Sequence, residues 1–239
     1  MPTLGSTLST ANIIPQGTNI AEMYMYDNVT KCEIDTTNVY HAVFNSFGNN
    51  DGTLAPQLDT NEFTYKAGVK VAITAYADYN APTSTQTECT TAGHTLLAGE
   101  PITITGTTNY NGTYLVLAAG LTATKFVITK AFAGDDATGN ARRPATLKVL
   151  NAGIIRVAFA VSGSCDSAND VLKFEMNKDI TPLDNVVCNA IWDTTTKYRT
   201  ASTSGFVSVT AGQYLWLSVK NYSGTGDITI RAANVNVKR

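Results

Sequence analysis

From residue 145 onward, apolar and polar side chains alternate in short runs that Gly and Asn residues interrupt. The run IIRVAFAVSG places Ile155, Val157 and Phe159 on one face of an extended chain. A repeat of two residues belongs to a strand, whereas a helix would need apolar residues at a spacing of 3.6. Because such runs recur about every ten residues with turn residues between them, we expect an antiparallel β-sandwich without long helices.

One of these strands is apolar on both of its faces. In GFVSVTAGQYLWLSVKN, Leu215, Leu217 and Val219 share one face, while Tyr214 and Trp216 share the other. A strand of this kind is covered on both sides, so we expect a sandwich core on one side and a subunit contact on the other. The candidate contact residues, which include an aromatic pair in MYMY and an apolar pair near the N-terminus, are Ile13, Ile14, Tyr24, Tyr26, Tyr214 and Trp216.

The low charge of the chain excludes several classes of partner. Charged residues make up 15% of the sequence and the net charge is −2, so no basic surface for nucleic acid is expected. No apolar run is long enough to span a membrane, which takes about 18 residues. The N-terminal residues also lack a signal-peptide pattern, and we expect synthesis in the cytoplasm of a host cell.

The side chains that could carry chemistry are few and scattered. The four cysteines are Cys32, Cys89, Cys165 and Cys188. They form no CxxC pair, and we expect them to be small buried apolar residues. The two histidines, His41 in a strand pattern and His94 in a turn-like stretch, lie near no nucleophile motif. We therefore expect no enzyme, no cofactor and no metal.

Two polar features leave alternatives open. Three loop acids could bind calcium: Asp51, Asp135 and Asp136. The spacing of an EF-hand is absent around them. Arg142 and Arg143 could clamp an acidic group, but we favour a solvated charge pair at a domain boundary.

The middle of the chain contains a hairpin signal. PITITG and TYLVLAAG flank Asn111-Gly112, a pair that suits the positive φ angles of a tight two-residue turn. This predicts an exposed hairpin tip formed by Asn109, Tyr110, Asn111 and Gly112. The tip could also hydrogen-bond a sugar through residues 107–110, but a purely structural hairpin is the favoured interpretation.

Two resemblances add to this reading. The runs GQYLWLSVKN, GDITIRAANVNV and IIRVAFAVSG resemble the tumour-necrosis-factor-like (TNF-like) jelly roll of virion proteins from tailed bacteriophages. GHTLLAGEPITITGTTNYNGTYLV with KFVIT is similar to a small β-barrel module that is inserted into many phage structural proteins. The first resemblance implies a homotrimer, because TNF-like jelly rolls usually pack around a threefold axis.

These observations give a fold class and a division of the chain. The expected fold is all-β: an antiparallel TNF-like jelly-roll sandwich with an inserted small β-barrel domain and an extended N-terminal arm. The expected parts are an arm at 1–20, jelly roll at 21–68, the insert at 69–144 and the rest of the jelly roll at 145–239.

The expected function follows from the resemblances. It is a non-enzymatic capsid decoration or cement protein on the exterior of the virion, with itself and the major capsid protein as partners. The alternative is a tail-fibre or tail-tip protein that recognises a host surface glycan. No nucleic acid or membrane partner is expected.

Overall fold

Strands alone make up the regular structure of the part of this chain that the structure describes. The computed structural model describes residues 19–25, 31–32, 39–44, 57–136, 138–192 and 198–239. These residues form strands and no helix, so this part of the chain has no helix that could cross a membrane.

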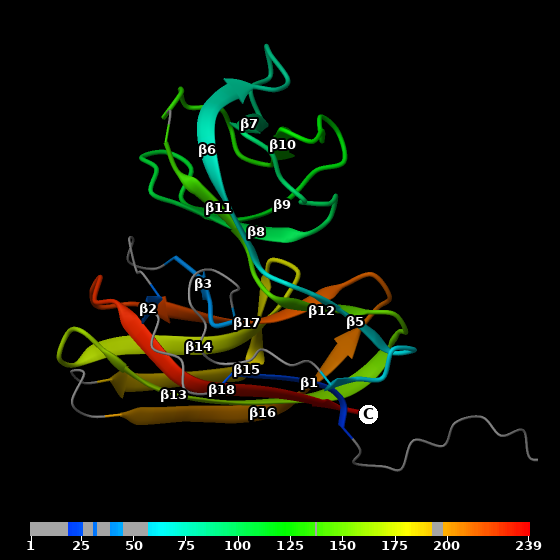
Figure 1. The fold of residues 1–239 in the computed structure, drawn as a ribbon, viewed down its shortest axis with the longest axis vertical. Helices are drawn as coiled ribbons and strands as arrows, with labels where there is room; N and C mark the ends of the chain where they lie inside the picture. Colours follow the sequence, from blue (N-terminus) through cyan, green and yellow to red (C-terminus); the bar gives the residue numbers. More distant parts are fainter. Residues whose placement is uncertain (1–18, 26–30, 33–38, 45–56, 137, 193–197) are drawn as a thin grey trace, which may run out of the picture.

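Two sheets lie face to face in the lower part of Figure 1. Sheet A runs in the order β16 (Arg199–Val209), β13 (Gly153–Cys165), β18 (Ile228–Lys238), β1 (Asn19–Met25) and β4 (Gln57–Leu58), with β2 (Lys31–Cys32) beside β18. Sheet B runs in the order β15 (Thr181–Trp192), β14 (Asp170–Lys178), β17 (Tyr214–Asn221), β12 (Thr146–Val149) and β5 (Phe63–Lys66), with β3 (His41–Ala42) beside β17.

The strand order is that of a jelly roll. If β1 and β12 to β18 are counted as strands one to eight, sheet A reads 1-8-3-6 and sheet B reads 2-7-4-5. Two interleaved Greek keys produce this order, and the strand pairs are antiparallel. The predicted antiparallel jelly roll is therefore confirmed. The predicted arm lies outside the described residues, except that Asn19 and Ile20 already belong to β1.

The predicted alternation builds the core between the sheets. Val157 and Phe159 of β13 point inward from sheet A, and Leu217 of β17 points inward from sheet B. All three are buried in one apolar cluster that both sheets share. Burying such side chains is the main favourable contribution to folding, at roughly 2 kcal/mol for each large residue.

An insert with a core of its own interrupts the jelly roll between β5 and β12. Its strands are β6 (Val69–Asp78), β7 (Thr87–Thr91), β8 (Pro101–Thr105), β9 (Gly112–Leu115), β10 (Lys125–Ile128) and β11 (Asn140–Arg143). They form one curled sheet in the order β10-β7-β6-β11-β8-β9. Beyond β9, the Leu117 amide donates a hydrogen bond to the carbonyl oxygen of Val127 in β10, at 2.9 Å, and so brings the two edges together.

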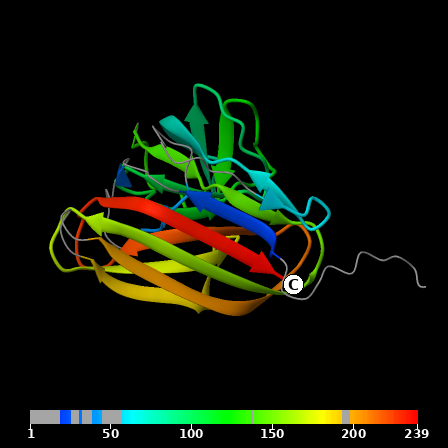
Figure 2. The ribbon, with the colours of Figure 1, turned by 60° about the horizontal axis from the view of Figure 1, so that its bottom comes forward.

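The insert lies on the outer side of sheet B and is joined to the jelly roll through β6 and β11, as Figures 1 and 2 show. These two strands pair with each other from Val69↔Arg143 to Ala72↔Asn140 and form a two-stranded stem. Sheet A lies on the opposite side of the sandwich, away from the insert.

The predicted turn at Asn111-Gly112 is wrong in detail. The loop between β8 and β9 spans residues 106–111, and Gly112 is already the first residue of β9. The Asn111 side chain closes this loop: its Oδ1 accepts from the Thr107 amide at 3.0 Å and its Nδ2 donates to the Thr107 carbonyl oxygen at 2.7 Å. Side-chain bonds to the backbone thus take the place of the expected two-residue turn.

Gly112→Val is expected to open the insert and leave the jelly roll folded. Gly112 has φ of +153°, and a Cβ atom there would lie 2.8 Å from the Tyr114 hydroxyl oxygen. We expect a cost of about 1–3 kcal/mol to the insert. Cys89, fully buried in the insert, should react faster with a thiol reagent, while the fluorescence of Trp192 and Trp216 in the jelly roll keeps its unfolding midpoint.

Thr113→Val is the matched control, because it places the same side chain one residue later in β9 without a positive φ. It should change the labelling rate of Cys89 little. Gly112→Val could instead raise the labelling rate of Cys89 and also lower the unfolding midpoint measured by tryptophan fluorescence. The insert and the jelly roll would then not unfold separately.

Candidate interaction surface

The outer face of sheet A is composed mostly of small side chains. Two rows of cross-strand neighbours define its centre: Ser202, Ala160, Asn234 and Tyr24 in one row, and Thr200, Ser162 and Ala232 in the next. The residues between them along each strand point into the core, since Val161 and Ala233 are buried. Strict alternation therefore leaves the small residues on the outside.

These small side chains leave a hollow in the face of the sheet. Its volume is about 510 Å³, and its lining residues are Tyr24, Met25, Ala160, Val161, Ser162, Thr200, Ala232, Ala233 and Asn234. No lining side chain is charged. The hollow is thus a shallow apolar depression with Ser, Thr and Asn groups among its walls.

Two large apolar side chains project from one end of the same face. Ile154 and Phe206 are each 68% exposed. Phe206 lies opposite Arg156 and Ile154 lies opposite Ser208, so the two apolar side chains are diagonal neighbours on adjacent strands. This pair of exposed apolar neighbours makes the end of the face a candidate for a contact with another molecule.

Around β17, the outer face of sheet B is covered within the chain itself, which corrects the prediction for Tyr214 and Trp216. Trp216 is fully buried and its Nε1 donates to the Asp179 carbonyl oxygen at 2.7 Å. Burial raises the pKa of Tyr214, and the nearby charge of Glu100 in the insert raises it further. Since neither side chain is exposed on the single chain, they do not form a free subunit contact.

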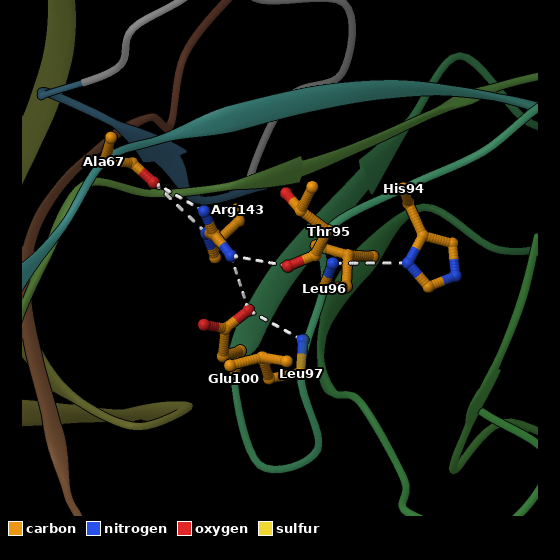
Figure 3. A network of polar contacts seen from close by, with 7 residues as sticks. All are labelled: Ala67, His94, Thr95, Leu96, Leu97, Glu100 and Arg143. Atoms are coloured by element: carbon orange, nitrogen blue, oxygen red, sulfur yellow. Dashed lines mark hydrogen bonds and ion pairs between the residues drawn. The ribbon is translucent and has the colours of Figure 1, made fainter. Parts of the chain in front are cut away.

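A buried ion pair lies at the base of the insert (Figure 3). Arg143 Nη1 lies 2.7 Å from Glu100 Oε2, and neither side chain is more than 8% exposed. Nε and Nη2 of Arg143 donate to the Ala67 carbonyl oxygen at 3.2 and 2.9 Å, and Nη1 also donates to the Thr95 carbonyl oxygen at 3.2 Å. Glu100 Oε2 in turn accepts from the Leu97 amide at 2.9 Å.

This pair, which we call the clasp, joins three segments that are distant in sequence: the chain entering the insert, the loop before β8, and the last residue of β11. The expectation of a solvated charge pair is therefore wrong for Arg143. The alternative, that this arginine binds an acidic group, matches its ion pair with Glu100. His94 lies beside the clasp, where its Nδ1 accepts from the Leu96 amide at 3.2 Å (Figure 3) and its ring meets Phe126 edge-on.

The hairpin residues that were predicted to be exposed differ in their environments. Asn109 is exposed, but Tyr110 is fully buried, so the prediction is wrong for that residue. The Tyr110 ring stacks on Tyr76 with centroids 4.3 Å apart, and its hydroxyl donates to the Gly134 carbonyl oxygen at 2.6 Å. Asn111 and Gly112 are half-buried. This loop is therefore anchored in the insert core and is not a free tip.

The acids considered for calcium are used in loop contacts. Asp136 accepts from the backbone amides of Thr108 and Asn109 at 3.0 and 2.8 Å, and Asp135 accepts from the Tyr76 amide at 2.9 Å. In the described part of the chain, no three His, Cys, Asp or Glu side chains are placed to hold a metal ion. Asp51 lies outside the described residues.

Of the six predicted contact residues, only Tyr24 is found in the hollow. Ile13, Ile14 and Tyr26 lie outside the described residues. The sequence analysis missed the small residues at the centre of sheet A, although alternation puts Ala158, Ala160 and Ser162 on the face opposite Val157 and Phe159. The run of small side chains at three successive outer positions of this strand is the signal that could have identified this surface.

Several solved structures are similar to this chain at low sequence identity and low TM-score. No family model matches the chain, and no curated protein matches it. Murine APRIL at pH 5.0 is similar over 72% of this chain and 100% of its own, with 12% identity and a TM-score of 0.32. Eiger TNF from S. frugiperda covers 71% of this chain and 92% of its own, with 11% identity and a TM-score of 0.31. A structure of infectious bursal disease virus, Gt strain, is similar over 94% of this chain and 69% of its own, with 10% identity and a TM-score of 0.27.

Likenesses at these TM-scores carry no argument about function. The assignment of a jelly roll depends on the strand order of the chain itself.

Proposed function

We propose that this chain is a non-enzymatic virion structural protein of a tailed bacteriophage, a decoration protein that binds the outside of the capsid as a homotrimer. The observation that supports this most is the asymmetry of the jelly roll. Sheet B is covered around β17 on the side of the insert, whereas the centre of the outer face of sheet A carries small uncharged side chains and a hollow of about 510 Å³. The resemblance of the C-terminal strands to phage TNF-like jelly rolls suggests the same role.

The face of sheet A suits contacts between identical subunits. Its centre is uncharged, and Ile154 and Phe206 supply large apolar groups at one end. Contacts between two different patches of identical chains form a closed ring when the rotation between the chains closes. We propose that a threefold ring joins the end carrying Phe206 on one subunit to the face of the next.

In such a ring the insert would point away from the subunit contacts, because it lies on the opposite side of the sandwich from sheet A. The major capsid protein is the proposed partner of the trimer. Stabilisation would follow from mass action, since a protein that binds only the assembled lattice shifts the equilibrium towards that lattice.

The proposed trimer predicts that Phe206→Ser weakens association. Burying this side chain at a subunit contact would contribute about 2 kcal/mol per contact. Sedimentation velocity over a range of concentrations should show a trimer for the natural chain and a shift towards monomer for the variant. Ile191→Ser is the control, because Ile191 is similarly exposed but belongs to β15 of sheet B; it should leave the trimer intact.

The capsid role is tested by adding the purified protein to phage particles that lack it. Saturable binding that raises the temperature at which the particles release DNA supports the proposal. If the protein formed trimers but bound no particles, the proposed capsid role would be contradicted and the proposed trimer would still hold.

A further inference from the structure

We infer that the hollow on sheet A binds Ile13 and Ile14 from the N-terminal arm of a second copy of this chain. The inference rests on the proposed assembly and specifies one of its contacts. Three observations carry it: the chemistry of the hollow, the chemistry of the arm, and the reach of the chain.

The hollow suits aliphatic side chains. Ala160, Ala232 and Met25 contribute apolar walls, while the hydroxyls of Ser162 and Thr200 are polar groups that could bind the backbone of a visiting segment. The Asn234 side chain is held in place by hydrogen bonds with Glu22 and Asn236. Its volume of about 510 Å³ falls within the range of roughly 300–1,000 Å³ that is usual for sites which enclose a ligand. Polar groups beside an apolar depression are the arrangement that recognises an extended peptide with apolar side chains.

The arm carries matching chemistry. Residues 1–20 contain no charged side chain, and Ile13-Ile14 is the one pair of adjacent large aliphatic residues in that segment. Pro15 follows directly, and a residue before proline is restricted to extended conformations. An uncharged segment with two isoleucines would bury its apolar groups in an uncharged hollow without leaving a charge unpaired.

The reach of the chain excludes the subunit's own arm. β1 begins at Asn19, and Tyr24 and Met25, at the far end of β1, line the hollow. The hollow is thus about 17–20 Å from Asn19 along the strand. Ile14 precedes Asn19 by five residues, which span at most about 17 Å when fully extended.

The segment from Ile14 to Asn19 of the same subunit would be fully extended along β1. No residues would remain to form the turn that places Ile14 on the outer face of sheet A. The isoleucines that enter the hollow must therefore come from another subunit. Exchange of terminal arms between identical subunits would also fix the order in which the ring closes.

The test is disulfide cross-linking between two differently tagged chains, one with Ile14→Cys and the other with Ala160→Cys, followed by peptide mapping. Ala160→Cys adds one sulfur atom at the hollow, and its unfolding midpoint should match that of the natural chain. The control pairs Ile14→Cys with Ser208→Cys, which lies on the same face of sheet A but near Phe206. We expect the 14–160 link between chains to form roughly tenfold more than the 14–208 link, because rates follow effective concentration.

Each outcome has a definite meaning. A 14–160 link between differently tagged chains supports the inference. A 14–160 link within one chain overturns it, as does absence of the link from a protein that is still a trimer; both leave the proposed assembly standing. A 206–160 link from Phe206→Cys, at a higher yield than 14–160, would show that Phe206 occupies the hollow and would also overturn it. A monomeric natural chain would contradict the assembly itself.

Discussion

Arg143→Met is expected to destabilise the insert by about 3–5 kcal/mol, because it leaves Glu100 buried without its positive partner. Glu100 is fully buried, and Arg143 also donates to the carbonyl oxygens of Ala67 and Thr95. Methionine fills much of the same space but donates to none of these groups. The denaturant dependence of Cys89 labelling measures the effect, since Cys89 is fully buried in the insert.

Two further variants separate the charge from the rest of the clasp. Lys125→Met is the matched control: Lys125 pairs with Glu88 at 2.6 Å in the same insert, but the lysine side chain is 44% exposed, so we expect a loss below about 1 kcal/mol. Arg143→Met combined with Glu100→Leu should recover part of the lost stability, because no charge then stays buried alone. If Arg143→Met cost no more than Lys125→Met, the clasp would not hold the insert together.

Gly163→Ala is expected to be the most damaging small substitution in the jelly roll. Gly163 lies at an irregularity in the pairing of β13 with β18, where a Cβ atom would be 2.1 Å from the Thr229 carbonyl oxygen and 2.8 Å from the Trp192 ring. Neither atom is the end of a flexible side chain, so the two strands must move apart. We expect a loss of about 3 kcal/mol or more in the free energy of unfolding, measured by tryptophan fluorescence.

Gly153→Ala is the control for this substitution. Gly153 is the first residue of the same strand, and an added Cβ atom would meet only the tip of the Arg239 side chain, which can swing away. The control should change the free energy of unfolding by less than about 1 kcal/mol. Equal losses in the two variants would show that the jelly roll does not depend on the close approach of β13 and β18 at Gly163.

The sequence alone predicts the strands of the sandwich well because their signal is local, whereas the jelly roll was expected from the resemblance. Alternation in β13 and β17 fixes which side chains enter the core, and Val157, Phe159 and Leu217 are buried as expected. The same alternation does not say what covers the other face of a strand. Tyr214 and Trp216 were therefore correctly placed on the outer face of β17, but their covering was wrongly assigned to another subunit.

Contacts between distant segments were less accessible to prediction. Arg143 and Glu100 are 43 residues apart in sequence, and no local pattern indicates that the fold brings them together. Asn111 illustrates a different failure, because its side chain has two possible uses. It can occupy a tight turn or hydrogen-bond nearby backbone, and here its bonds to Thr107 select the longer loop.

The measurement that tests the central proposal most directly is quantitative mass spectrometry of purified phage particles that encode this chain, with its copies counted against the major capsid protein. The account predicts a ratio near one copy for every few capsid subunits, as a decoration of the whole lattice requires. A handful of copies per particle would instead indicate a tail fibre or tail tip, and complete absence from the particles would contradict a virion role altogether.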